Sequence, residues 1–227
     1  FCKSKCAYCD FYSLPHSEEK MDAYTAALIR HLEEVAPRCA AHTADTVYFG
    51  GGTPSYLGEK RLIKLLKTVK KRYHVAAGAE ITLEANPDSA GDWKTLRALR
   101  RAGFNRVSLG VQAADDALLR RIGRVHTWDQ VLSSVAAARM AGFDNLGLDL
   151  IYGLPGQTMA AWQDTLRAAA ALETQPAQLC RELRRTHVFT HIRWEMVCYH
   201  IRCRCAPMRF VWASPAELRE TYALPTA

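Results

Sequence analysis

The 227-residue sequence predicts an α/β protein with a parallel sheet, and three observations support this fold class. Short segments rich in β-branched and aromatic residues alternate with longer segments of helical spacing, which is typical of βαβ units. Glycines or polar residues follow the strand-like segments, where parallel α/β folds form their binding sites. Apolar residues make up 49% of the chain and charged residues 23%, as in an ordinary globular protein.

The first ninety residues contain two helical and two strand-like segments. Residues 17–36 predict a helix with Ser17 as its N-cap and an apolar stripe formed by Met21, Tyr24, Leu28, Leu32 and Val35. Residues 45–54 predict a short strand that ends in glycines. Residues 59–73 return to helical spacing, and residues 79–87 predict the second strand.

The same alternation continues to residue 172. The expected elements are a helix at 90–103 that stops at Gly103, a strand at 105–112, helices at 115–123 and 128–142, a strand and loop at 145–157, and a helix at 159–172. Four strands separated by helices predict a barrel-like or doubly wound sheet. A complete eight-unit barrel needs about 250 residues, so this region can form at most a partial (β/α) barrel.

Polar residues and glycines cluster at the ends of these strands. Residues 50–54, GGGTP, follow the first strand, and Glu84 lies where the second strand ends. Gln112 follows the third strand, and Asp149 is near the end of the fourth. Because parallel strands end at the same edge of a sheet, we expect these residues to form one rim.

Three cysteines stand in a C-x3-C-x2-C array at the start of the sequence, namely Cys2, Cys6 and Cys9. A structural zinc site needs four ligands, and no further His or Cys lies nearby to supply the fourth. A [4Fe–4S] cluster held by three thiolates leaves one iron open for a substrate or cofactor. The spacing therefore favours an iron–sulfur cluster.

Composition and charge exclude some classes of protein and leave others open. No run of 18 apolar residues and no charged-then-apolar leader is found, so we expect a cytoplasmic protein with no membrane span. Disulfides are rare in that compartment, and the eight cysteines therefore indicate metal ligands or incidental thiols. Residues 181–209 hold seven arginines and two acidic residues, which suits either phosphate contacts or a solvated surface.

Five motifs together resemble the radical S-adenosylmethionine superfamily: FCKSKCAYCDFYS, VYFGGGTPSYL, EANPD, GFNRVSLGVQ and LDLIYGLPGQT. Within it they are similar to the oxygen-independent coproporphyrinogen III oxidase-like branch, which includes a haem chaperone type. The resemblance covers residues 1–172. It implies a partial (β/α) barrel of the radical S-adenosylmethionine type. It also implies a [4Fe–4S] cluster whose open iron binds S-adenosylmethionine, and haem or a porphyrin as cargo or substrate.

The resemblance also implies roles for individual residues. The cluster ligands would be Cys2, Cys6 and Cys9, and the aromatic residue that packs near the adenine would be Tyr8. The methionyl amine would be received by Gly51, Gly52 and Thr53. The ribose, carboxylate and adenosyl parts would be held by Glu84, Gln112, Arg124 and Asp149. Each polar residue has a simpler interpretation, as a helix-end cation for Arg124, a surface acid for Glu84, a turn residue for Gln112 and a strand-end cap for Asp149. No catalytic residue is assigned.

Two departures from the family pattern refine these expectations. The oxidase type resembles C-x3-C-x2-C-x-C, whereas here Phe11 stands where the fourth cysteine would be. We therefore expect the chaperone type, with the oxidase as the alternative. The family also has a strand ahead of the cysteines, so the implied barrel lacks its first strand, as a truncated reading frame would explain.

The C-terminal segment resembles a different protein. Residues 175–227 are similar to part of the Nudix-like C-terminal domain of adenine DNA glycosylases, which recognises 8-oxoguanine, with Phe189, Thr190 and His191 at its signature. This implies a junction at 173–182 followed by a small β-rich fragment at 183–227. We expect DNA binding by this tail to be weak at most, and an inactive chimera is a further alternative.

Overall fold

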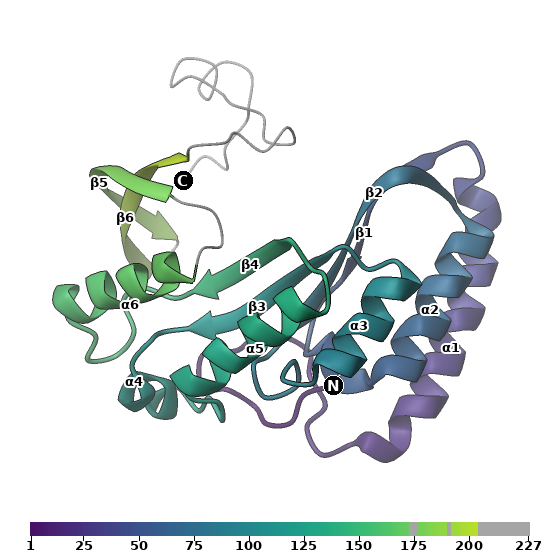
Figure 1. The fold of residues 1–227 in the computed structure, drawn as a ribbon, viewed down its shortest axis with the longest axis horizontal. Helices are drawn as coiled ribbons and strands as arrows, with labels where there is room; N and C mark the ends of the chain where they lie inside the picture. Colours follow the sequence, from purple (N-terminus) through teal and green to yellow (C-terminus); the bar gives the residue numbers. More distant parts are fainter. Residues whose placement is uncertain (173–176, 190–191, 204–227) are drawn as a thin grey trace. The chain divides into compact units, whose positions relative to one another are not determined.

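The computed structural model describes residues 1–172, 177–189 and 192–203, the last two ranges as backbone strands (Figure 1). The chain divides into two compact units, Phe1–Thr174 and Gln175–Ala227. Across the described ranges, no helix combines the length and hydropathy that a membrane span requires.

The first unit is built on a four-stranded parallel sheet, which confirms the predicted α/β class. Its strands follow each other in the order β1 (Thr43–Phe49), β2 (His74–Ala85), β3 (Arg106–Gln112) and β4 (Asn145–Leu150). Each neighbouring pair is parallel. The carboxyl ends of all four strands therefore meet at one edge of the sheet.

Helices connect the strands, as the alternating pattern predicts. They are α1 (Met21–Val35), α2 (Glu59–Arg72), α3 (Trp93–Ala102), α4 (Asp116–Arg121), α5 (Trp128–Met140) and α6 (Met159–Ala171), with 3₁₀ turns η1 (Glu18–Lys20), η2 (Ala36–Cys39) and η3 (Pro54–Leu57). Helices α1, α2, α3 and α5 line up along one side of the sheet (Figure 1). The core lies between these helices and the strands.

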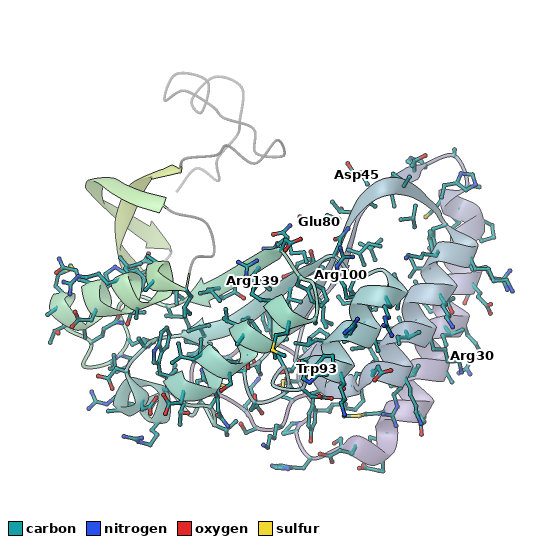
Figure 2. All side chains as sticks on the ribbon, viewed as in Figure 1. Arg30, Asp45, Glu80, Trp93, Arg100 and Arg139 are labelled. Atoms are coloured by element: carbon teal, nitrogen blue, oxygen red, sulfur yellow. The ribbon has the colours of Figure 1, made fainter. Side chains whose placement is uncertain are left out.

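The two faces of the sheet differ in polarity because side chains alternate along each strand. On β3, Val107, Leu109 and Val111 are fully buried in the core beneath the helices. The alternate positions carry polar groups or glycine, such as Ser108 and Gly110. One face of the sheet is thus packed, and the other is available for polar chemistry. Glu80 lies towards the amino ends of the strands (Figure 2), where it accepts a hydrogen bond from Asn145 Nδ2 at 3.2 Å.

Two details of the first helix differ from the prediction. Ser17 does not cap the helix, because it precedes η1 and its Oγ donates to the Pro15 carbonyl at 3.1 Å. Tyr24, assigned to the apolar stripe, is 47% exposed and meets the ring of Phe1 edge-on, with 5.2 Å between the ring centroids.

The predicted end of helix α3 at Gly103 is confirmed. Gly103 has a φ of 115°, in the left-handed region that favours glycine.

The second unit contains an antiparallel pair, β5 (Ala177–Phe189) and β6 (Ile192–Cys203). Strand β5 begins inside residues 173–182, the range predicted to be a junction, because Ala177 already pairs with Cys203. Of the residues matched to the glycosylase signature, Phe189 is the last of β5. Thr190 and His191 lie outside the described residues, and so does the part of the predicted fragment that follows Cys203.

Candidate functional site

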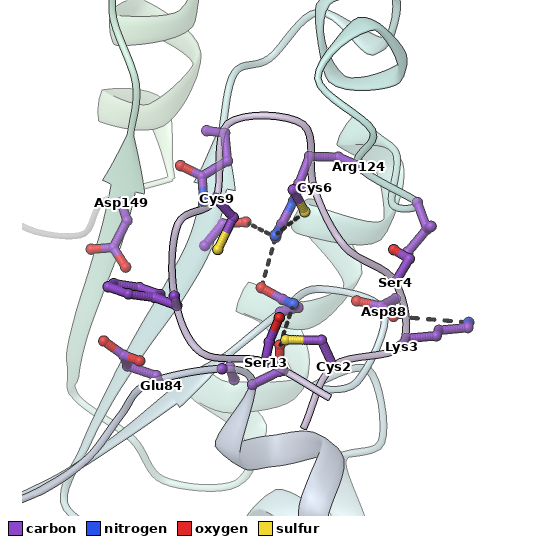
Figure 3. Close-up of a pocket in the computed structure, with 18 of the residues that line it drawn as sticks. Cys2, Lys3, Ser4, Cys6, Cys9, Ser13, Glu84, Asp88, Arg124 and Asp149 are labelled. Atoms are coloured by element: carbon purple, nitrogen blue, oxygen red, sulfur yellow. Dashed lines mark hydrogen bonds and ion pairs between the residues drawn. The ribbon is translucent and has the colours of Figure 1, made fainter. Parts of the chain in front are cut away.

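A cavity of about 160 Å³ lies at the carboxyl ends of the strands (Figure 3). Its lining brings together all the residues that the sequence analysis placed in a site of the first unit: Cys2, Cys6, Tyr8, Cys9, Gly51, Gly52, Thr53, Glu84, Gln112, Arg124 and Asp149. It also includes polar residues that the sequence analysis did not single out, among them Ser13, Asn86, Asp88 and Ser108. The residues of the predicted rim therefore line one cavity.

Backbone hydrogen bonds hold the cysteine-bearing loop over this cavity. Near its start, Cys2 N donates to the Leu14 carbonyl at 3.3 Å, and Thr53 N donates to the Phe1 carbonyl at 2.7 Å. In its middle, Ala7 N donates to the Ile122 carbonyl at 3.0 Å. The loop is thus tied both to the glycine-rich segment after β1 and to the end of α4.

The three thiols are free and partly buried, and two of them lie close to side-chain hydrogen-bond donors. Thr53 Oγ1 is 3.4 Å from Cys2 Sγ, and Arg124 Nη1 is 3.7 Å from Cys6 Sγ. A Cβ at Gly52 would lie 2.8 Å from the Phe1 carbonyl oxygen and 3.2 Å from Cys2 Sγ, so glycine is required for this approach.

The spread of these thiols bears on the kind of metal group they can hold. Within the described part of the chain, no three His, Cys, Asp or Glu side chains converge closely enough to hold a single metal ion. Each thiolate of an iron–sulfur cluster binds a different iron, so its ligands do not need to meet at one point. Three free thiols that line one cavity are therefore compatible with such a cluster.

Arg124 joins the cysteine loop to two strand ends. Its Nη2 donates to Asn86 Oδ1 at 2.7 Å and to the Gly110 carbonyl at 2.6 Å. Asn86 Nδ2 in turn donates to Thr53 Oγ1 at 2.9 Å. Asn86 follows directly after β2, and this position in the EANPD motif is the signal that could have identified it.

The two carboxylates predicted for the rim are Glu84 on β2 and Asp149 on β4, and both line the cavity. Glu84 accepts hydrogen bonds from Gly51 N, at 3.0 Å, and from the Tyr48 hydroxyl. Asp149 accepts one from Ser108 Oγ at 3.1 Å. Partial burial, together with the bond to Glu84, raises the pKa of Tyr48 to about 12. The roles of Tyr48 and Ser108 could not be predicted from sequence, because a single polar residue inside a strand has no neighbouring pattern that marks it as part of a site.

Tyr8 lies between two of the cysteines in sequence and lines the same cavity. Burial raises the pKa of its phenol to about 12, although the nearby charge of Arg124 acts in the opposite direction. A tyrosine is neutral at pH 7 even without this shift, so the ring can pack against a flat, uncharged group.

Behind the rim, His126 is only 3% exposed, and burial, with the charge of Arg124, lowers its pKa to about 4. An unfolded histidine titrates at about 6.5, so the unfolded state binds the extra proton between these values. We expect the free energy of unfolding to fall by about 2 kcal/mol between pH 7 and pH 5 and to fall no further on this account below about pH 4.

Urea unfolding of the wild type and His126→Gln at pH 7 and pH 5 measures this contribution. The variant lacks the titrating imidazole, so its stability should change much less over the interval. Carboxylates whose pKa is lowered, such as Asp92, take up protons only below this pH range, so they do not contribute to the difference in stability between pH 7 and pH 5. Equal losses in both proteins would show that His126 is not the group responsible.

Comparison with known proteins gives consistent results for the first unit. The family model for the Radical SAM superfamily matches residues 1–169. The curated heme chaperone HemW of Lactococcus lactis is 41% identical over 159 residues, covering 70% of this chain and 41% of the relative. HemW of Bacillus subtilis is 37% identical over 176 residues, covering 77% and 46%.

Among solved structures, coproporphyrinogen III oxidase (HemN) from Escherichia coli superposes with a TM-score of 0.71 and 33% identity, covering 76% of this chain and 40% of that one. Methylornithine synthase (PylB) shares the fold at a TM-score of 0.51 and 19% identity, covering 76% and 48%. This chain thus spans less than half the length of the curated relatives named above.

Proposed function

Because the chain belongs to the radical S-adenosylmethionine superfamily, we propose that its cavity binds a [4Fe–4S] cluster through Cys2, Cys6 and Cys9, with S-adenosylmethionine beside it. The observation that carries the proposal is the meeting of three free thiols with a polar rim from four strands in one cavity. When bound, the cluster supplies one electron to the sulfonium of S-adenosylmethionine.

The residues of the cavity divide the work of binding. Gly51 and Gly52 expose backbone to the methionyl part, since no Cβ intervenes. The carboxylates of Glu84 and Asp149 offer acceptors to ribose hydroxyls or the amine. Arg124 places a cation beside the Cys6 sulfur, and the neutral ring of Tyr8 covers the adenine. These roles are the ones that the resemblance to the family implies, and the structure supports them by placing each of these residues in the lining of one cavity.

Within the superfamily, we propose the haem chaperone type. Several curated relatives, at 37% to 41% identity, carry that name, and Phe11 lines the cavity at the position where the oxidase type has a fourth cysteine. Coproporphyrinogen III oxidase activity is the second candidate, favoured by the similarity to HemN. Release of CO₂ from coproporphyrinogen by the reconstituted protein would select the oxidase, and haem binding without it would select the chaperone.

The tail receives no proposed function. The family match ends at residue 169, so three hypotheses about the tail stay predictions. They are the similarity of residues 175–227 to a glycosylase module, weak DNA binding through Phe189, Thr190 and His191, and an inactive chimera.

The cofactor assignment is tested by binding of S-adenosylmethionine to the cluster-loaded protein, measured by calorimetry under anaerobic conditions. Glu84→Ala and Asp149→Ala each remove an acceptor from the rim, and we expect each to weaken binding by about 10-fold or more. Asp45→Ala is the matched control, because Asp45 is exposed at the amino end of β1, far along the sheet from the cavity (Figure 2). Affinity that neither rim substitution changes would refute the assignment.

A further inference from the structure

Gln112, at the end of β3, has an unusual backbone conformation. Its φ is 69°, and it is one of two non-glycine residues with positive φ in the described chain. Ala113 N donates to the Val111 carbonyl at 2.9 Å, which closes a three-residue γ-turn around Gln112. This form of the turn is rare and strained for an L-residue, so the surroundings must hold it in place.

Two hydrogen bonds from distant parts of the chain hold the turn. His126 Nε2 lies 3.1 Å from the Val111 carbonyl oxygen, and because a carbonyl can only accept, Nε2 carries the proton. Ile151 N donates to the Gln112 carbonyl at 3.0 Å. The Val111 carbonyl therefore accepts two bonds, one inside the turn and one from His126.

The surroundings of His126 indicate that this donated bond is its contribution. The side chain is almost completely buried, and its Nδ1 has no hydrogen-bond partner among the described residues. A buried acceptor without a partner is unfavourable, and an apolar ring would avoid that loss. What an apolar ring cannot supply is the hydrogen bond to the turn.

The turn determines where the Gln112 amide lies. Gln112 is 8% exposed, lines the cavity and makes no side-chain hydrogen bond to the described residues. A Cβ at Gly110 would lie 3.0 Å from Gln112 Nε2, so the glycine leaves room for the amide. One interpretation of Gln112 from sequence, a turn residue, is therefore compatible with the other, a ligand-binding residue.

We propose that His126 is a positioning residue that, through the Val111 carbonyl, holds the strained turn and so directs the Gln112 amide towards S-adenosylmethionine. This inference rests on the proposed function, because it assumes that the cavity holds that cofactor. His126 itself does not touch the cofactor. Its effect on binding must therefore pass through Gln112.

A double-mutant cycle tests this dependence. The proteins are wild type, His126→Phe, Gln112→Ala and the double variant, each loaded with its cluster, and the measurement is S-adenosylmethionine affinity by calorimetry. Each single substitution should weaken binding by about 5- to 10-fold, the effect of one hydrogen bond in a buried site. The double variant should bind no more weakly than Gln112→Ala alone, because the amide that His126 positions is already absent.

Three further proteins separate positioning from general loss of stability. His126→Gln keeps a donor at a similar reach and should retain affinity within about 3-fold. Thr25→Val is the matched control, since it removes a buried bond from Thr25 Oγ1 to the Met21 carbonyl, 2.7 Å long, in α1 away from the cavity. If His126→Phe does not fold, His126→Asn, whose shorter side chain cannot reach Val111, replaces it.

A second readout does not require the cluster. In cluster-free protein, the backbone amide signals of Gln112 and Ala113 should shift in His126→Phe and stay in place in His126→Gln and Thr25→Val. Losses of affinity that multiply in the double variant, or unshifted amide signals in His126→Phe, would overturn the inference. Failure of cluster-loaded wild type to bind S-adenosylmethionine would refute the proposed function instead, and the amide signals would still decide whether His126 holds the turn.

Discussion

Replacing Cys2, Cys6 and Cys9 together with alanine is expected to remove the cluster iron from the reconstituted protein completely. Thiolates are the groups that hold the irons, and the three thiols line one cavity on a loop fixed by the bonds of Cys2, Ala7 and Thr53. Single substitutions should leave little iron, because two thiolates hold a cluster poorly. The measurement is iron and sulfide per chain, with the visible absorbance of the cluster.

The matched control is Cys39→Ala, a partly buried thiol in η2 that does not line the cavity. Cys180, Cys198, Cys203 and Cys205 in the second unit should also be dispensable for iron binding. Full iron content in the triple variant, or loss of iron in Cys39→Ala, would show that the ligands have been assigned wrongly.

The second large effect is expected at Arg124. Replacing Arg124 with Met keeps an unbranched, flexible stem but removes the guanidinium, and with it the donors to Asn86, the Gly110 carbonyl and Cys6 Sγ. Hydrogen bonds from a charged group are worth about 1.5–3 kcal/mol each, so the loss of even one corresponds to a 10- to 100-fold change. We expect S-adenosylmethionine affinity to fall at least 10-fold, and cluster content to fall as well.

The control for this prediction is Arg121→Met, three residues earlier in the chain. Arg121 is exposed at the end of α4 and donates to the Pro155 carbonyl at 2.9 Å, outside the cavity. Cluster content and cofactor affinity are measured separately, so that a weaker cofactor interaction is not confused with loss of iron. If Arg124→Met binds the cluster and the cofactor as the wild type does, the hydrogen bonds of Arg124 are not needed to hold the site together.

The sequence by itself determined the parallel α/β class and the place of the cavity. Both depend on local signals, namely the periodicity of apolar residues and the residue types that follow each strand. Parallel strands place their carboxyl ends at one edge whatever their exact packing. For that reason Glu84, Gln112 and Asp149, far apart in sequence, could be expected at one rim. The C-x3-C-x2-C spacing identified the cysteines in the same local way.

Only the tertiary structure decided which side chains meet within that rim. Asn86 connects Arg124 to Thr53 across separations of 38 and 33 residues, and no local pattern specifies such contacts. The same holds for His126 at the Val111 carbonyl. These bonds depend on strand register and on how loops close over the sheet, which many weak interactions fix together.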